Sequence, residues 1–111
     1  MENTIELKGK KYGMMYTLGA HLAYCNWVVA TPKASYADAY IQKLIFMILA
    51  YNNVNGIKNN DPPKKEDLAT EPYYVFDDIM KAVDACEKAG SERKVEAEPK
   101  KGNGKSAAKS S

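Results

Sequence analysis

Apolar and polar residues alternate at the start of the chain, on both sides of Gly9, which stands between Lys8 and Lys10. An alternation of period two is typical of a strand with one covered face, and glycine suits the turn of a hairpin. The pattern predicts a short β-hairpin over residues 4–15, whose alternating apolar positions are Ile5, Leu7, Tyr12 and Met14.

After the hairpin the apolar residues recur at the spacing of a helix. Thr17 is an acceptable N-cap, and the apolar residues that follow it on one helical face are Leu18, Leu22, Cys25 and Val29. We therefore predict a first helix over residues 18–29. Pro32 prevents its continuation, because the residue before a proline is moved out of helical geometry.

A second helix is predicted over residues 36–52. Ser35 followed by Asp38 resembles a capping box, and the asparagines and Gly56 beyond the helix favour a left-handed end. Its centre, residues 44–51, is eight apolar residues in a row, too few for a membrane span, which takes about 20. Two interpretations are open: the helix is central and covered by the other elements, or one of its faces is covered by another chain.

The C-terminal half begins with polar residues 52–67, which contain a Pro-Pro pair and predict a long loop. A third, amphipathic helix is predicted over residues 71–89, capped by Thr70 and stopped by Gly90; its apolar positions include Phe76, Ile79, Met80, Val83 and Cys86. Residues 91–111 are too polar to offset their ordering entropy, so we predict a disordered basic tail. The expected fold class is α+β, with one domain over residues 1–90 formed by a short N-terminal hairpin and about three helices.

Composition and charge narrow the class of partner. The 111 residues are 45% hydrophobic and 27% charged, as in an ordinary globular domain. Residues 1–90 hold ten Lys and Arg against eleven Asp and Glu, whereas residues 91–111 hold six against three. A nucleic-acid-binding fold usually carries a basic patch, so nucleic acid is disfavoured as a partner, and no membrane partner is expected. We interpret Cys25 and Cys86 as small buried residues of a cytoplasmic protein, with a disulfide as the alternative.

The sequence offers no constellation that indicates catalysis. His21 is the single histidine, and with two distant cysteines it cannot supply the four ligands of a recognisable zinc site; we interpret it as a surface or hydrogen-bonded residue. Asp77 and Asp78 lie on a charged helical face beside Lys81, whereas acid–base catalysis needs burial in a cleft. We therefore expect a protein that is not an enzyme and that uses no metal and no other cofactor.

Tyrosine and methionine are abundant, with eight and five residues respectively. Tyr, Trp and Met are enriched at the centres of protein interfaces, and Met suits surfaces that adapt to varied partners. The alternative to a binding surface is that these residues form the core of the domain, and the two interpretations can hold together. The partner-binding candidates are Met14, Trp27, Tyr40, Phe46, Met47, Tyr51, Tyr73 and Tyr74.

The order of these segments resembles that of the tail assembly chaperones of long-tailed bacteriophages and prophages. The resemblance rests on the hairpin sequence IELKGKKYGMMYT, the hydrophobic helix YADAYIQKLIFMILAYNN, a polar loop, a third helix and the tail KVEAEPKKGNGKSAAKSS. It covers nearly the whole chain and is a pattern of size and order. The first helix, LGAHLAYCNWVVA, departs from that pattern because it carries no charged residue.

The resemblance implies a non-enzymatic protein of the bacterial host cytoplasm. Such a protein binds the long, helical, aggregation-prone tape measure protein and helps recruit tail tube subunits, and it can form a homo-oligomer. The hydrophobic second helix and the Tyr- and Met-rich faces are then the expected contact surfaces. The alternative hypothesis is a small DNA- or RNA-associated regulator, whose basic tail would supply phosphate contacts.

Overall fold

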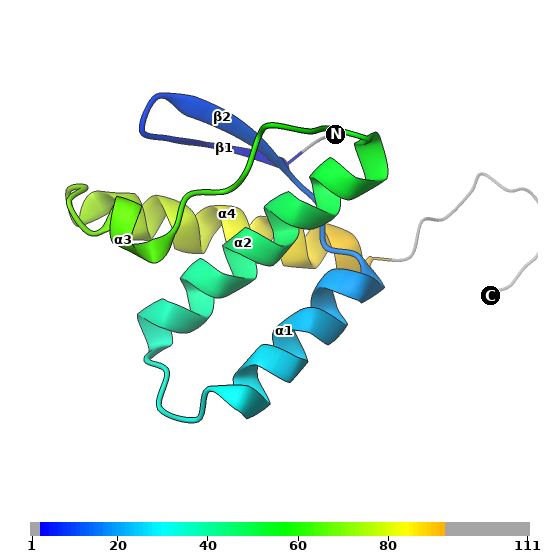
Figure 1. The fold of residues 1–111 in the computed structure, drawn as a ribbon, viewed down its shortest axis with the longest axis horizontal. Helices are drawn as coiled ribbons and strands as arrows, with labels where there is room; N and C mark the ends of the chain where they lie inside the picture. The colour runs from blue at the N-terminus through cyan, green and yellow to red at the C-terminus, as the bar shows by residue number, and fades with distance from the viewer. Residues whose placement is uncertain (1–2, 93–111) are drawn as a thin grey trace, which may run out of the picture.

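The computed structural model describes residues 3–92 of the chain. Over that range a two-stranded antiparallel hairpin is followed by helices (Figure 1), which confirms the expected α+β class. The elements in order are β1 (Asn3–Leu7), β2 (Lys10–Met14), α1 (Leu18–Ala30), α2 (Tyr36–Asn55), α3 (Lys65–Leu68) and α4 (Tyr74–Ser91). The predicted tail, apart from Ser91 and Glu92, lies outside the described residues.

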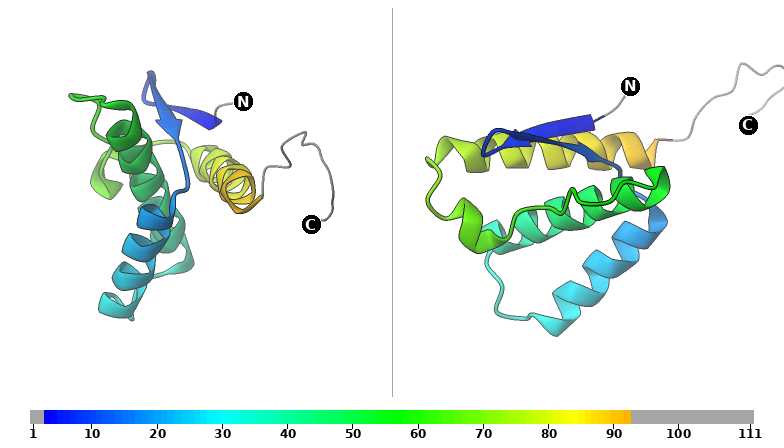
Figure 2. Two further views of the ribbon diagram at one scale, coloured as in Figure 1. Left: turned by 90° about the vertical axis from the view of Figure 1, so that its right-hand side faces the viewer. Right: turned by 45° about the horizontal axis from the view of Figure 1, so that its top comes forward.

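The hairpin turns through Lys8 and Gly9, whose φ angles of 52° and 76° are both positive, as in a two-residue type I′ turn. This places Leu7 opposite Lys10 and Ile5 opposite Tyr12. The alternating apolar residues Ile5, Leu7, Tyr12 and Met14 are all buried. β2 lies against α2 and β1 against α4, so the hairpin closes one side of the core (Figures 1 and 2).

The apolar helix α2 is central. It contacts α1, β2 and α4, and Leu44, Met47 and Ile48 are completely buried among these elements. Of the two interpretations of residues 44–51, the structure shows the first: the helix is largely covered within the chain. Leu49 stays exposed on its remaining face. Within residues 3–92, every helix is too short or too polar to span a bilayer.

Side-chain caps fix the beginnings of α1 and α2 as predicted. The Thr17 Oγ1 accepts a hydrogen bond from the Ala20 amide at 3.1 Å. The Ser35 Oγ accepts from the Asp38 amide at 3.0 Å, and the Asp38 carboxylate accepts from the Ser35 amide at 3.1 Å, which completes a capping box. α2 continues three residues beyond its predicted end and stops at Gly56, whose φ is 63°.

Three predictions about the C-terminal half were wrong. The polar loop contains the short helix α3, whose Leu68 is buried in the core. α4 begins at Tyr74, so Thr70 does not cap it, and no side chain forms a cap hydrogen bond there. Gly90 is not a stop, because α4 continues through it to Ser91.

The two cysteines differ in exposure and are both free thiols. Cys86 is buried beside Ile79 and Val83 on the inner face of α4, as predicted. Cys25 is exposed, so its predicted burial was wrong. The physical reason is the orientation of α1, which turns the face carrying Cys25 away from the core.

Candidate protein-binding surface

Helix α1 has two apolar faces. The inner face packs on α2 through small and aromatic residues: Ala20 is buried, and Tyr24 and Trp27 are half-buried. The opposite face carries the α1 stripe, which we define as Leu18, Leu22, Cys25 and Val29. Leu18 is 73% exposed, Leu22 is 55% exposed and Val29 is 82% exposed.

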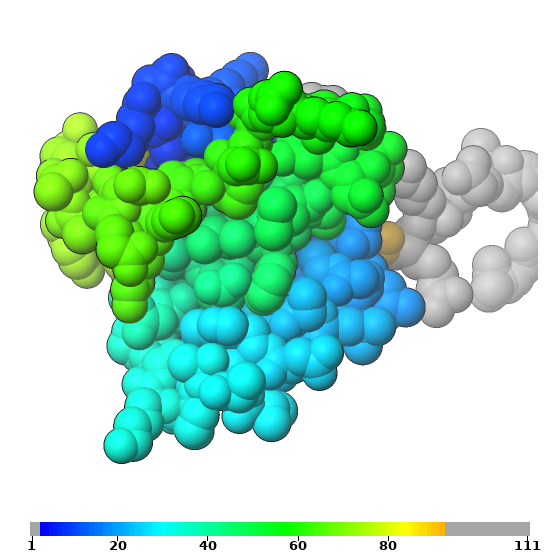
Figure 3. Space-filling view, viewed as in Figure 1, coloured from blue at the N-terminus to red at the C-terminus, as the bar shows by residue number. Residues whose placement is uncertain are grey.

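The α1 stripe differs from the exposed face of an ordinary surface helix because no Asp, Glu, Lys or Arg lies beside it on α1. The 13 residues of α1 include no Asp, Glu, Lys or Arg, and its exposed polar side chains are His21 and Asn26, whereas the exposed face of a helix is normally rich in charged and polar side chains. In Figure 3 α1, coloured blue to cyan, lies along one edge of the molecule, and no other element covers it in this view. Contiguous exposed apolar surface of this kind marks interaction sites.

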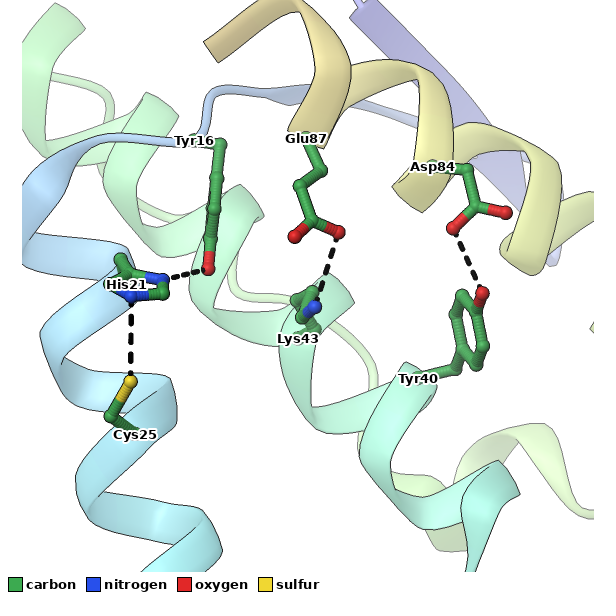
Figure 4. Close-up of polar contacts among 7 residues, drawn as sticks. All are labelled: Tyr16, His21, Cys25, Tyr40, Lys43, Asp84 and Glu87. Carbon is green, nitrogen blue, oxygen red and sulfur yellow. Dashed lines mark hydrogen bonds and ion pairs between the residues drawn. The ribbon is translucent and has the colours of Figure 1, made fainter. Parts of the chain in front are cut away.

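A chain of polar contacts anchors the start of α1. The Tyr16 hydroxyl and the His21 Nδ1 are 2.5 Å apart, and the His21 Nε2 and the Cys25 Sγ are 3.5 Å apart (Figure 4). Burial raises the pKa of Tyr16 to about 12, with smaller contributions from Glu87, Cys25 and Tyr24. Tyr16 is therefore protonated at neutral pH and able to donate its hydrogen bond.

Lys43 joins the three long helices. Its Nζ lies 3.2 Å from the Glu87 Oε1 on α4, 4.5 Å from the centre of the Tyr24 ring on α1 and 5.9 Å from that of Tyr16. Ammonium groups are attracted to aromatic faces at these distances. Lys43 thus links α2 to the inner face of α1 on one side and to α4 on the other, and the α1 stripe stays outside these contacts.

Tyr40 makes a parallel contact between α2 and α4. Its hydroxyl donates a hydrogen bond to the Asp84 Oδ1 at 2.8 Å (Figure 4). This bond to a carboxylate is the main reason why the pKa of Tyr40 is raised. The polar groups of Figure 4 are therefore paired with one another, at the start of α1 in one set and between α2 and α4 in the other, and their arrangement is that of a structural network.

A second apolar surface lies at the N-terminal end of α4. It is a hollow of about 340 Å³, here called the α4 groove, and its walls include Ile41, Leu68, Pro72, Tyr73 and Phe76. Tyr73 and the adjacent Tyr74 are exposed. Of its lining residues, Leu68 and Ile79 belong to the hydrophobic core and Ile41 packs against it, so the groove borders the core.

The eight predicted partner-binding residues do not form one surface. Met14 and Met47 are 3% and 0% exposed, so they offer no surface to a partner in this structure. The other six reach the surface: Trp27 on α1 and Tyr40, Phe46 and Tyr51 on α2 are half-buried, and Tyr73 and Tyr74 at the start of α4 are exposed. Tyr40 and Tyr73 both lie beside the ring of Phe76.

Sequence reasoning missed the exposure of the α1 stripe. The stripe itself has regular helical spacing, which is normally a sign of burial. The one sequence signal for this exposure lies on the opposite face of the helix. There the small residues Ala20 and Ala23 allow α1 to approach α2 closely, and the aromatic residues Tyr24 and Trp27 supply the packing.

The part of the chain that the structure describes contains no group of three or more His, Cys, Asp or Glu residues that could hold a metal ion. No protein-family model matches the sequence, and the searches of curated proteins and of solved structures gave no match. The exposed apolar surfaces of α1 and α4 are the features of the described residues that indicate a binding function.

Proposed function

We propose that this protein is a tail assembly chaperone of a long-tailed phage or prophage, which binds the helical tape measure protein and helps recruit tail tube subunits. The observation that carries the proposal is the exposed α1 stripe on a helix without charge. The resemblance in segment order supports it, as does the near balance of charges over residues 1–90.

The stripe suits capture of a helix. Its members are separated by four, three and four residues, the spacing of an apolar seam between two helices. Covering a Leu or Val side chain contributes about 1.5–3 kcal/mol before the entropy costs of association. Three such side chains support reversible binding of a client that must later be released to its own assembly.

The alternative, a nucleic-acid-associated regulator, depends on the basic tail. Residues 93–111 lie outside the described residues, and residues 1–92 hold ten Lys and Arg against twelve Asp and Glu. The proposed chaperone function is favoured because its contact surface lies within the folded domain.

Co-expression tests the proposal. The tape measure protein of the same phage or prophage genome is produced alone, with the native protein, or with the double variant Leu22→Glu/Val29→Glu. The control is Lys58→Glu in the exposed loop after α2, which alters the net charge by the same two units as the double variant.

We expect the native protein and the control to keep the tape measure protein in the soluble fraction and the double variant to lose this effect. If co-expression with the native protein gives no more soluble tape measure protein than the tape measure protein expressed alone, the proposed chaperone function is wrong. If the double variant equals the native protein, the α1 stripe is not the contact surface.

A further inference from the structure

We infer that Cys25 is a modification site, at which its thiol exchanges with the disulfide of a low-molecular-weight thiol and His21 acts as the base. The chemistry follows from contacts between described residues at the start of α1. Its effect on the α1 stripe rests, in addition, on the proposed function.

The nucleophile and the base lie one helical turn apart on α1. Residues four positions apart are neighbours on the surface of a helix, and the His21 Nε2 lies 3.5 Å from the Cys25 Sγ (Figure 4). Both residues are exposed, so a small molecule can reach the sulfur. The other thiol, Cys86, is buried and is therefore protected from the same reaction.

The second ring nitrogen of His21 is held by Tyr16. The Tyr16 hydroxyl lies 2.5 Å from the His21 Nδ1, and the two rings meet edge-on at 87°. When Nδ1 carries the ring proton, it donates to the Tyr16 oxygen, and Nε2 can then accept the thiol proton. A nucleophile, a base and a third group that orients the base form the arrangement that activates cysteines in proteins.

The exchange balances with the small disulfide as its one co-reactant. The thiolate is the attacking form of a cysteine, so the His21 Nε2 takes the proton from Cys25 as its sulfur attacks one sulfur of the disulfide. A new S–S bond forms while the old one breaks, and the departing thiolate receives the proton from His21. Cys25 is thereby oxidised to a mixed disulfide, and the departing half of the reagent is reduced to a thiol.

The modified sulfur lies within the α1 stripe, between Leu22 and Val29. A glutathione adduct at Cys25 would bring carboxylates and an ammonium group onto this apolar face. Burial of charged groups against an apolar helix is unfavourable. The adduct should therefore close the stripe to a helical client, and a reducing thiol should reopen it.

Rates of reaction with oxidised glutathione, followed by the mass of the intact protein, test the chemistry. The matched control is Val29→Cys/Cys25→Ala. It moves the thiol one turn along the same stripe, to a position that is 82% exposed in the native protein, and it leaves an alanine four residues before the thiol. His21→Gln removes the base but keeps a polar side chain, and Tyr16→Phe removes the hydroxyl that orients the base.

We expect Cys25 to react about tenfold faster than the thiol at position 29, which is less than a general base contributes in enzymes. His21→Gln should abolish this advantage, and Tyr16→Phe should reduce it. Neither change should alter the rate at position 29 when it is combined with the control.

A native rate no higher than that of the control, or a rate unchanged by His21→Gln, would overturn the inference. Equal losses at positions 25 and 29 would also overturn it, because a base acts only on the thiol beside it. If Tyr16→Phe reacts as fast as the native protein, Tyr16 does not position the base.

A second measurement separates this chemistry from the proposed function. The tape measure protein is diluted from denaturant into the native protein, its glutathione adduct, or the adduct treated with a reducing thiol, and its aggregation is followed by light scattering. We expect suppression by the native and the reduced protein but not by the adduct. An adduct as effective as the native protein contradicts the effect on the stripe. A native protein without effect contradicts the proposed function alone, since the rates decide the chemistry independently.

Discussion

The substitution Gly90→Ala should destabilise the protein, although the same change inside an exposed helix normally stabilises it. Gly90 lies in the last turn of α4, with helical backbone. A Cβ at this position would lie 2.6 Å from the Tyr16 carbonyl oxygen and 2.9 Å from the Tyr16 Cβ. Both atoms belong to the segment that leads into α1, so the helix or that segment must move.

Two opposing contributions decide the size of the effect. Replacing a helical glycine by alanine contributes about 0.5–1 kcal/mol of stability through the lower entropy of the unfolded chain. Inserting a methyl group where there is no space costs about 1–3 kcal/mol. The nearest atom is a backbone oxygen, which cannot rotate away, so the second effect is larger. We expect a net loss of about 0.5–2 kcal/mol.

Urea denaturation followed by far-ultraviolet circular dichroism measures this loss. Ala89→Gly is the matched control, because position 89 is exposed in the same turn and reports helix propensity alone, with an expected loss of about 0.5–1 kcal/mol. If Gly90→Ala instead raises the free energy of unfolding by the amount that helix propensity predicts, the close contact between α4 and Tyr16 is absent in solution.

Three further predictions concern protonation, thiol reactivity and capping. The pKa of Tyr16 is raised from 10.0 to about 12, so the unfolded chain loses its proton first and stability should fall as the pH rises between these values; Tyr16→Phe should make that decline less steep in urea titrations. A thiol reagent should modify the exposed Cys25 rapidly and the buried Cys86 only at the rate of unfolding; equal rates would contradict the packing of α4. Ser35→Ala removes the oxygen that caps α2 and should cost about 0.5–2 kcal/mol in urea denaturation, whereas an unchanged midpoint would show that the cap contributes nothing.

The sequence predicted the elements whose signals are local. Alternation specified the buried positions of the hairpin, and the side chains of Thr17, Ser35 and Asp38 specified where α1 and α2 begin. The apolar face of α4 was also predicted, because charged residues occupy its opposite face. In each case the polar residues carried as much information as the apolar ones.

Features that depend on contacts between distant segments could not be predicted in the same way. Both faces of α1 are apolar, so periodicity cannot tell which of them meets α2. Gly90 has the sequence appearance of a helix stop, but its role depends on Tyr16, a residue of another segment. The short α3 forms in a polar loop because Leu68 reaches the core. The candidate surface therefore came from the structure, although its residues had been identified as one helical face.

Hydrogen exchange on the complex with the tape measure protein tests the central claim, that the α1 stripe is the surface for a helical client. α1 has few buried residues, so its amides should exchange through local opening in the dilute free protein. We predict that exchange over residues 18–30 slows on binding, while exchange at the N-terminal end of α4 stays unchanged. Unchanged exchange in α1, with slowing confined to the residues of the α4 groove, would contradict it.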